Sequence, residues 1–423
     1  MNNPSNIDIE VRRLGERAKL ASQKMAIAPT EKKNAVLRRI AAALRSESAV
    51  DVLRANEIDV KNAERDGLSA AMIDRLRLDR ARLDGVAKGL DQVAQLPDPV
   101  GETLNHRVLE NGLSIAQMRV PLGVIAMIYE SRPAVTVDAA ALCLKSGNAV
   151  ILRGGKEAYE SNRAFAAIVE NALNEEGLPA DAVLLIPTID RQATTALIRL
   201  DGLVDVVIPR GGEGLINFVA KNATVPVLNH YKGVCHVYVD AEANLDDATA
   251  IVLNSKVQRP GVCNAMETLL VDEAIAETYV PQIVAALVDH GVEVRADDRV
   301  RALSNGRASN AAPDFDAEYL DLICNLKIVD GIDGALDHVR KHGSQHTEAI
   351  LTENRDRQTR WLREVDASFV VTNASTRFND GFQLGLGAEI GISTTKLHAY
   401  GPMGLQELCA LKWIGEGQGQ IRQ

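Results

Sequence analysis

From residue 121 onwards, short apolar segments alternate with longer helical ones, and this alternation limits the possible fold more than any other feature. The apolar segments are Gly123–Tyr129, Ala149–Leu152, Val183–Ile186, Val204–Ile208 and Pro226–Leu228. The helical stretches are Pro133–Lys145, Ser161–Glu175, Ala193–Leu200 and Glu213–Lys221. Continuous apolar strands separated by helices predict a parallel sheet covered on both faces. Nucleotide-binding domains have this architecture, although no G-x-G-x-x-G follows any of these strands.

A second series of elements follows. We expect a strand at His236–Asp240, a helix at Leu245–Lys256, a strand at Thr268–Val271 and helices through residues 273–290. The stretch Asp297–Asp316 is rich in Ala, Asn, Asp and Arg, which predicts surface loops.

The first part of the chain reads differently. Residues 6–95 carry apolar side chains at three- and four-residue spacing, which predicts helices. Two short apolar runs around Arg107–Leu109 and Ser114–Met118 are separated by Asn111-Gly112, a dipeptide typical of two-residue hairpin turns.

The length of 423 residues predicts two or three domains. A net charge of −10 argues against broad nucleic-acid binding. The sequence contains no run of eighteen apolar residues, so no membrane span is predicted. The first residues lack the pattern of a secretory signal. We therefore expect a cytoplasmic protein that acts on a small molecule, with neither nucleic acid nor membrane as partner.

The five cysteines are odd in number and form no C-x-x-C pair, so reduced thiols are expected rather than disulfides or a zinc site. The sharpest chemical candidate is Cys263 in the segment Gln258–Ala265. Pro260 and Gly261 force an irregular turn that can expose a thiol, and Arg259 would favour the thiolate. The residues alone are equally compatible with a buried structural cysteine at a helix–strand joint.

Ten segments in order along the chain resemble the γ-glutamyl phosphate reductase (glutamate-5-semialdehyde dehydrogenase) branch of the aldehyde-dehydrogenase superfamily. They are Met118–Ile125, Ile128–Pro133, Leu142–Asn148, Ile151–Gly155, Ile208–Gly212, Cys235–Asp240, Gln258–Ala265, His342–Thr347, Leu384–Gly391 and Gly401–Leu405. The resemblance runs from about residue 100 to the end, and it favours Cys263 as the catalytic nucleophile. Tyr400 stands where this family is expected to carry Arg.

The resemblance implies an α/β, aldehyde-dehydrogenase-like fold with a Rossmann-type parallel-sheet cofactor domain. Residues 1–104 and 121–238 would form this NADP-binding domain, and residues 239–405 the α/β catalytic domain. Residues 105–120 and 406–423 would form a small β oligomerisation arm, joined by a strand near Leu411–Ile414. A projecting hairpin needs its edges covered, so a homo-oligomer, dimer or higher, is expected. A transient contact with the upstream glutamate kinase is a further expectation.

The implied reaction reduces L-glutamate 5-phosphate with NADPH to L-glutamate 5-semialdehyde and phosphate, a step of proline biosynthesis. Cys263 would form a thioester, and the backbone N–H of Cys263 is one candidate oxyanion donor. Ser131 stands where aldehyde-oxidising relatives carry an Asn donor. Hydrolytic relatives place a Glu in an E-L-G-G-K segment as the base for water, whereas the corresponding segment Leu228–Gly233 has no carboxylate.

For the cofactor, Arg153 and Lys156 follow the strand Ala149–Leu152, and their basic character favours NADPH over NADH because a 2′-phosphate needs positive charge. Gly211 and Gly212 precede a helix and would admit the pyrophosphate to its N-terminus. Glu318 occupies the position where relatives hold the nicotinamide ribose.

The substrate phosphate requires cationic groups, for which Arg132, Arg259 and Arg377 are candidates that the sequence does not rank. His338, His342 and His346 are spaced like a helical metal face, but Gly343 should end that helix, so no metal is predicted. His342 and His346 are expected instead to shape the wall of the catalytic domain.

Two other interpretations stay open. One is a superfamily aldehyde dehydrogenase or acyl reductase that acts on another substrate, and dependence on phosphate would separate it from the first. The other is a non-catalytic scaffold that keeps the fold for binding, against which the intact Cys263 segment speaks.

Overall fold

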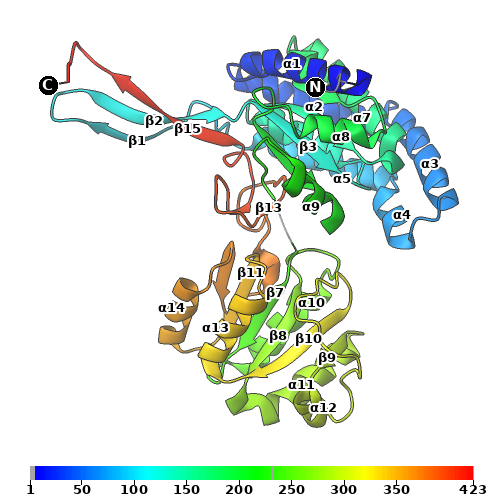
Figure 1. Ribbon diagram of the computed structural model, residues 1–423, viewed down its shortest axis with the longest axis vertical. Helices are drawn as coiled ribbons and strands as arrows, with labels where there is room; N and C mark the ends of the chain where they lie inside the picture. The colour runs from blue at the N-terminus through cyan, green and yellow to red at the C-terminus, as the bar shows by residue number, and fades with distance from the viewer. Residues whose placement is uncertain (1–4, 230–231, 423) are drawn as a thin grey trace. The chain divides into compact units, whose positions relative to one another are not determined.

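The computed structural model describes residues 5–229 and 232–422, which form two compact units (Figure 1). Unit 1 comprises residues 1–229, 386–391 and 403–423, and unit 2 comprises residues 230–385 and 392–402. Within the described ranges, no helix is both long and apolar enough to cross a membrane.

Unit 1 begins with five helices, as the spacing of apolar residues predicts. They are α1 (Asn6–Met25), α2 (Thr30–Arg45), α3 (Ala49–Arg65), α4 (Ala70–Leu76) and α5 (Arg80–Gln95). Val11, Leu14 and Ala18 of α1 lie at three- and four-residue spacing and are buried against the sheet of this unit. The carboxylate of Asp59 on α3 accepts the backbone N–H of Ser161 at 2.8 Å, which ties α3 to the first turn of α7.

The sheet of unit 1 has four parallel strands in the order β5-β4-β3-β6. The strands are β3 (Val124–Tyr129), β4 (Ala149–Gly154), β5 (Val183–Leu185) and β6 (Val206–Arg210). The helices that follow β3 to β6 are α6 (Val135–Lys145), α7 (Tyr159–Glu175), α8 (Arg191–Leu197) and α9 (Glu213–Asn222), with 3₁₀ turns η1 (Lys156–Ala158) and η2 (Ala180–Ala182). The order reverses between β3 and β6, and ligands bind at such a switch point in doubly wound sheets.

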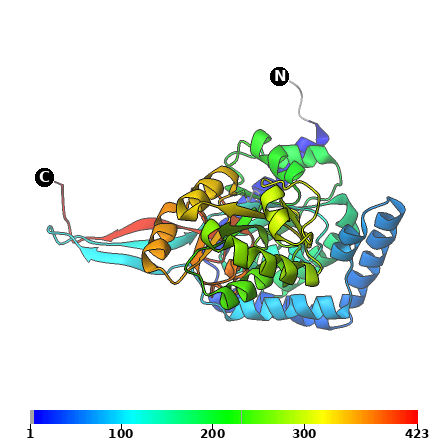
Figure 2. The ribbon, with the colours of Figure 1, turned by 90° about the horizontal axis from the view of Figure 1, so that it is seen from below.

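A separate three-stranded antiparallel sheet with the order β1-β2-β15 also belongs to unit 1. Its strands are β1 (Thr103–Val108), β2 (Ser114–Pro121) and β15 (Cys409–Glu416), which confirms the predicted hairpin and the return of the chain near residues 411–414. In Figures 1 and 2 it extends as a ribbon away from the helices of its unit. The turn is longer than the predicted two residues. The backbone N–H of Leu109 donates to the carbonyl oxygen of Leu113 at 2.9 Å, so three residues lie between them, and Gly112 among these has a φ of +82°.

Unit 2 contains a six-stranded parallel sheet with the order β12-β11-β7-β8-β10-β9. Its strands are β7 (Cys235–Val239), β8 (Met266–Asp272), β9 (Glu293–Ala296), β10 (Ile323–Val329), β11 (Thr347–Leu351) and β12 (Phe369–Thr372). Its helices are α10 (Leu245–Val257), α11 (Ala276–Asp289), α12 (Asp298–Leu303), α13 (Gly331–His342) and α14 (Arg355–Glu364), with 3₁₀ turns η3 (Glu273–Ile275) and η4 (Thr376–Phe378). A two-stranded pair, β13 (Ile392–Ser393) and β14 (Gly401–Pro402), completes this unit.

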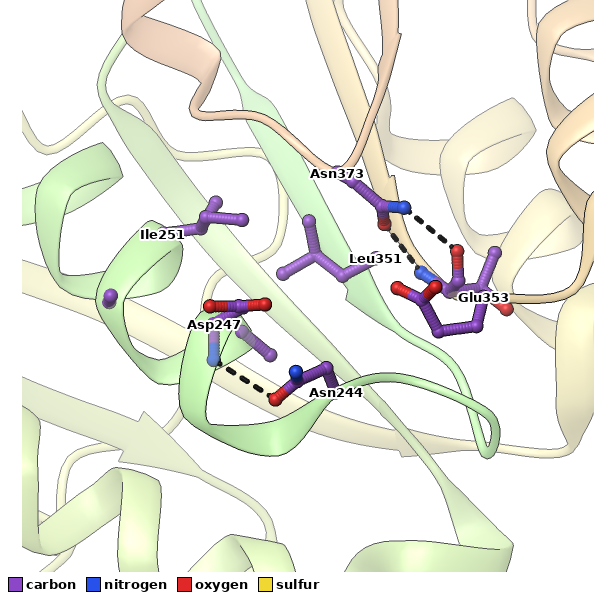
Figure 3. A pocket seen from close by; sticks show the side chains of 9 residues that line it. Asn244, Asp247, Ile251, Leu351, Glu353 and Asn373 are labelled. Atoms are coloured by element: carbon purple, nitrogen blue, oxygen red, sulfur yellow. Dashed lines mark hydrogen bonds between the residues drawn. The ribbon is translucent and has the colours of Figure 1, made fainter.

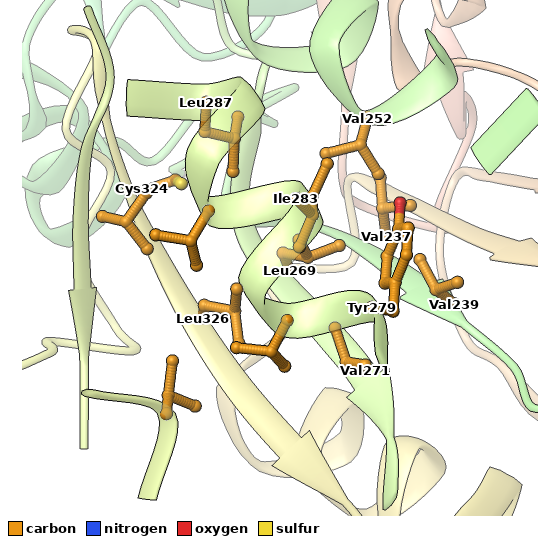
Figure 4. Packing of buried hydrophobic residues seen from close by; sticks show 14 of the residues in the cluster. Val237, Val239, Val252, Leu269, Val271, Tyr279, Ile283, Leu287, Cys324 and Leu326 are labelled. Atoms are coloured by element: carbon orange, nitrogen blue, oxygen red, sulfur yellow. The ribbon is translucent and has the colours of Figure 1, made fainter. Parts of the chain in front are cut away.

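The larger core of unit 2 lies between this sheet and α10 and α11. Figure 4 shows Val237, Leu269 and Leu326 of the strands packed against Tyr279 and Ile283 of α11. Every residue of β7 and β8 is buried, as expected for central strands that are covered on both faces. Because these strands cannot shift without exposing their apolar side chains, the loops at their ends are held in place.

Two sequence predictions are wrong in detail. The stretch Asp297–Asp316 is not entirely loop, because Asp297 caps the backbone N–H of Val300 at 3.0 Å and the short helix α12 buries Val300. The segment Pro226–Leu228 is not a full strand and forms one parallel bridge between Val227 and Val207.

Candidate active site

Cysteine exposure singles out one thiol. Cys143, Cys235, Cys324 and Cys409 are buried, whereas Cys263 is partly exposed, and none of these five described cysteines forms a disulfide. Burial raises the pKa of Cys324 and of Cys409 to about 12, and it also raises that of Cys143. Burial raises the pKa of Cys235 as well. A thiol must ionise to act as a nucleophile, so these four are poor candidates and Cys263 is left as the candidate.

Cys263 lies in the loop between α10 and β8, at the amino edge of the sheet of unit 2. Gly233, just before β7, packs directly against it: a Cβ on Gly233 would lie 1.9 Å from the carbonyl oxygen of Cys263. Only glycine permits this approach. The segment 228–233, the predicted counterpart of the E-L-G-G-K segment, therefore contacts the loop of Cys263 through Gly233. His230 and Tyr231 of that segment lie outside the described residues.

A buried polar layer supports the loop of Cys263. The Cys235 thiol donates to the carbonyl oxygen of Cys263 at 3.1 Å and lies 3.6 Å from Nδ1 of His346, which is itself 2.7 Å from Oγ1 of Thr347. Burial lowers the pKa of His346 to about 4, so the imidazole is neutral at neutral pH. His346 therefore lies in the buried layer that supports the Cys263 loop, in the wall of the catalytic domain where the sequence analysis expected it.

Asn379 extends the same layer. Asn264, which follows Cys263, donates to the carbonyl oxygen of Asn379 at 2.8 Å, and the Asn379 amide donates to Thr347 Oγ1 at 2.8 Å. Asn264 and Asn379 are both buried. The sequence analysis did not identify these amides, because their partners lie more than thirty residues away along the chain.

Two of the three predicted arginines are near Cys263. Burial lowers the pKa of Arg377, and the positive charge of nearby Arg259 lowers it further, whereas Asp380 and Cys263 raise it. Arg377 Nε also donates to Gln258 Oε1 at 2.9 Å, which holds the guanidinium beside the segment that carries Cys263. Arg259 is exposed. Arg132 is an exposed residue of unit 1, after β3.

Glu318 also reaches this region. Its Oε1 accepts the backbone N–H of Gly233 at 2.9 Å, and Gly233 in turn contacts the Cys263 carbonyl. The half-buried carboxylate is thus linked through Gly233 to the loop that carries Cys263.

In unit 1, Ser131 directly follows the central strand β3. It has a φ of +47°, and both its backbone N–H and its hydroxyl donate to Glu157 Oε1, at 2.5 and 3.0 Å. The left-handed backbone is uncommon for serine, and the two bonds to Glu157 hold it in place. Glu157 was absent from the sequence predictions because its partner is twenty-six residues away.

Gly211 and Gly212 lie at the start of α9, on the other side of the switch point. The backbone N–H of Gly212 donates to Glu130 Oε2 at 2.9 Å, and a Cβ on Gly211 would lie 2.3 Å from the same oxygen. The glycines therefore leave room at the helix N-terminus for an anionic group, and in this structure a carboxylate of the chain fills it. The sequence analysis named the glycines but not Glu130.

Arg153 and Lys156 lie differently with respect to the strand β4. Arg153 does not follow the strand: β4 continues to Gly154, and the buried guanidinium donates to the backbone carbonyls of Gly154, Ile189 (3.0 Å) and Asp190 (3.2 Å). Burial lowers its pKa. Lys156 follows β4 and is exposed.

Two other features carry less chemistry. A hollow of about 270 Å³ at the carboxyl edge of the unit 2 sheet is lined by a mixture of apolar and polar residues, among them Ile251, Leu351, Asp247 and Glu353. Asn373 in this lining binds the backbone of Thr352, and Asn244 caps α10 (Figure 3). Helix α13 ends at His342 with Gly343 as its C-cap, as predicted, so His346 does not share a helical face with His338 and His342. Across residues 5–229 and 232–422, no group of three His, Cys, Asp or Glu side chains could hold a metal ion.

Comparison with known proteins decides the family. The aldehyde dehydrogenase family model matches residues 5–304. A protein of Sorangium cellulosum called γ-glutamyl phosphate reductase is 53% identical over 99% of both chains, and one of Solidesulfovibrio magneticus with the same name is 54% identical over 98% of this chain and 99% of its own. The chain belongs to the γ-glutamyl phosphate reductases of the aldehyde dehydrogenase family.

Solved structures agree with this membership. A crystal structure of γ-glutamyl phosphate reductase from Thermotoga maritima matches with a TM-score of 0.95 and 44% identity over 98% of this chain and 100% of that one. An acetylating aldehyde dehydrogenase from Geobacillus thermoglucosidasius, at 18% identity and a TM-score of 0.68, shares the fold. The predicted aldehyde-dehydrogenase-like α/β fold is confirmed, and the chain is an oxidoreductase.

The contact between Gly233 and Cys263 leads to a stability prediction. Gly233→Ala should lower the free energy of unfolding by about 1–3 kcal/mol, because the new methyl group overlaps a backbone oxygen that cannot turn away as a side chain can. Urea denaturation measures the change. Gly334→Ala on α13 is the matched control, because a Cβ there meets only ordinary contacts of 3.5 Å or more, and it should cause no loss. Equal stability of the two variants would contradict the close approach.

Proposed function

We propose that this chain reduces L-glutamate 5-phosphate with NADPH to L-glutamate 5-semialdehyde and phosphate, through a thioester on Cys263. The observation that carries the proposal is the partly exposed Cys263, whose backbone is held by Gly233 and Cys235. Relatives that carry the name γ-glutamyl phosphate reductase are 50–54% identical over nearly the whole chain, which supports the substrate and the place in proline biosynthesis.

The chemistry proceeds in two stages on the same sulfur. The Cys263 thiolate attacks the acyl carbon, the carbon–oxygen bond to phosphate breaks, and inorganic phosphate leaves. NADPH, when bound, would supply a hydride to the acyl carbon. The resulting oxyanion then re-forms the carbonyl group, expels the Cys263 thiolate and releases the aldehyde.

Two groups of the chain are suited to stabilise the oxyanion of each stage. The backbone N–H of Cys263 is one, because the Gly233 contact and the Cys235 thiol keep the loop rigid. The Ser131 hydroxyl is the second proposed donor, and it would have to turn its single O–H from Glu157 to the oxyanion when substrate binds.

Water must not compete with hydride for the thioester. Among the described residues of the segment 228–233, Leu228, Asn229, Lys232 and Gly233 provide no carboxylate. The nearby Glu318 carboxylate already accepts the Gly233 N–H. This arrangement supports a phosphate-linked reductase rather than a hydrolytic dehydrogenase.

Arg259 and Arg377 are the better placed of the proposed phosphate ligands. Both lie near Cys263 in unit 2, and their charges act on one another. An anionic phosphate between them would relieve this repulsion as well as form charge-assisted hydrogen bonds. We propose Arg132 of unit 1 as a third ligand of the substrate phosphate.

The residues of unit 1 fit a dinucleotide. The order β5-β4-β3-β6 corresponds to the first four strands of the Rossmann order, and Gly211 and Gly212 stand at its switch point. Exposed Lys156 would contact the 2′-phosphate of NADPH, while Arg153 would hold the 189–190 backbone beside it. Glu130 would release the Gly212 N–H when a pyrophosphate binds there.

The reaction is tested in the reverse direction by following NADPH formation at 340 nm. Glutamate semialdehyde and NADP should give NADPH only when inorganic phosphate is present, because phosphate must take the acyl group from the Cys263 thioester. Cys263→Ala should lose at least about 10³-fold of this activity, since it removes the nucleophile. Cys324→Ala is the matched control and should retain the activity, because Cys324 is buried.

Two results would contradict the proposal. Activity that is independent of phosphate would mean that water accepts the acyl group, as in a hydrolytic aldehyde dehydrogenase. Turnover of other aldehydes in preference to glutamate semialdehyde would assign another acyl substrate.

Lys156 is tested separately. Lys156→Met should raise the KM for NADPH about tenfold or more and change that for NADH much less, because only NADPH carries the 2′-phosphate. Steady-state kinetics with both cofactors measure the ratio. Lys221→Met, an exposed lysine in the last turn of α9, is the control. Equal effects on both cofactors would remove Lys156 from the 2′-phosphate site.

The sheet β1-β2-β15 is proposed as the oligomerisation arm. Val108, Leu411 and Trp413 of this sheet are exposed, and unpaired strand edges favour pairing with another copy. Sedimentation should therefore give a mass at least twice the 45.7 kDa of one chain. Trp413→Asp should shift the mass toward one chain, and a monomeric wild-type protein would contradict the proposal.

A further inference from the structure

Two residues that flank Cys263 in the sequence, Lys256 and Glu267, form a fully buried ion pair. Lys256 stands in the last turn of α10 and Glu267 on β8, and the Lys256 Nζ lies 2.9 Å from Glu267 Oε2 with neither side chain exposed. Removing two charges from water costs free energy that their attraction alone repays poorly, so a buried pair is a weak source of stability. Such a pair is better explained by what else its atoms hold in place.

The second oxygen of Glu267 binds a backbone turn. Glu267 Oε1 accepts the N–H of Leu320 at 3.3 Å, and the carboxylate also accepts the N–H of Tyr319. Leu320 has a φ of +53°, a left-handed conformation that is unfavourable for a leucine. The turn therefore depends on outside contacts to keep this shape, and Glu267 supplies two of them.

Glu318 enters this turn directly before Tyr319. Its Oε1 accepts the Gly233 N–H at 2.9 Å, and the Gly233 α-carbon packs on the carbonyl of Cys263. A continuous series of contacts within unit 2 thus joins Lys256, Glu267, the 319–320 backbone and Glu318 to the nucleophile loop.

We propose that Glu267, with Lys256 as its counter-ion, is a positioning residue that orients Glu318 toward the nicotinamide ribose of the cofactor. This inference rests on the proposed function and on the sequence-based expectation that Glu318 contacts that ribose. Glu267 does not touch the cofactor or the reacting atoms. Glu267 restricts the conformations of the turn that carries Glu318. The conformational entropy of this turn is therefore lost when the chain folds, and not when the cofactor binds.

Two double variants distinguish the loss of the hydrogen-bond acceptor at position 267 from the loss of the charges of Lys256 and Glu267. Lys256→Met with Glu267→Gln removes both charges but keeps an amide oxygen for the Tyr319 and Leu320 N–H groups. Lys256→Met with Glu267→Leu also removes both charges but leaves these N–H groups without that acceptor. The Kd for NADPH, measured by fluorescence titration, should rise at least about tenfold in the Leu variant and less than about threefold in the Gln variant.

Steady-state kinetics and melting temperature complete the readout. The KM for NADPH should follow the Kd, whereas the KM for glutamate 5-phosphate should stay within about twofold of wild type. The control is Arg299→Met with Glu273→Leu, which removes an exposed ion pair of the same unit and should change none of these values. A merely structural pair would alter stability in both double variants without separating their NADPH affinities.

A variant that keeps the charge covers the case in which the Leu variant does not fold. Glu267→Asp preserves a carboxylate for Lys256 but withdraws it from the turn by one methylene, so its Kd for NADPH should rise about threefold or more. Wild-type affinity in the Asp variant, or equal affinity in folded Gln and Leu variants, would overturn the proposal.

The failure of the proposed function would look different. If Glu318→Gln leaves NADPH affinity unchanged while phosphate-dependent, Cys263-dependent turnover persists, the positioning inference fails and the proposed reaction stands. If wild-type turnover depends on neither Cys263 nor phosphate, the proposed reaction itself fails.

Discussion

The close contact between Gly233 and the Cys263 carbonyl is the constraint on which the candidate active site depends. It exists because β7 and β8 are neighbouring parallel strands, so the segments that enter them meet at the same edge of the sheet. Both strands are buried throughout, and neither can move without exposing apolar side chains. The packing of the sheet thereby also fixes the position of the Cys263 loop.

The electrostatics around Cys263 follow from the same arrangement. Behind the loop lie a neutral histidine, a protonated thiol and two amides, all buried, and the buried charges of Lys256 and Glu267 compensate one another. In front, Arg259 and Arg377 carry positive charge near the sulfur. An anionic acyl phosphate and a thiolate are both stabilised by such surroundings, whereas a cationic substrate is not.

The switch point of unit 1 shows where sequence reasoning reached its limit. Gly211, Gly212 and Ser131 could be named because glycines before a helix and residues after a central strand have recognisable positions. Glu130 and Glu157, which bind them, could not be named, because nothing in a linear pattern says which carboxylate folds back on which N–H group. Arg153 was expected to follow the strand Ala149–Leu152, and its burial beside the 189–190 backbone depends on a contact across thirty-six residues.

The sequence by itself determined the alternation of strands and helices and the presence of the hairpin, and it singled out Cys263 as the candidate, because these follow from local periodicity, turn chemistry and a family resemblance carried by short segments. Only the tertiary structure decided the strand orders, the return of residues 386–391 and 403–423 to unit 1 and the partners of the site residues. Such features depend on packing between segments far apart in the chain. A sequence pattern records which face of an element is apolar, but not which other element covers it.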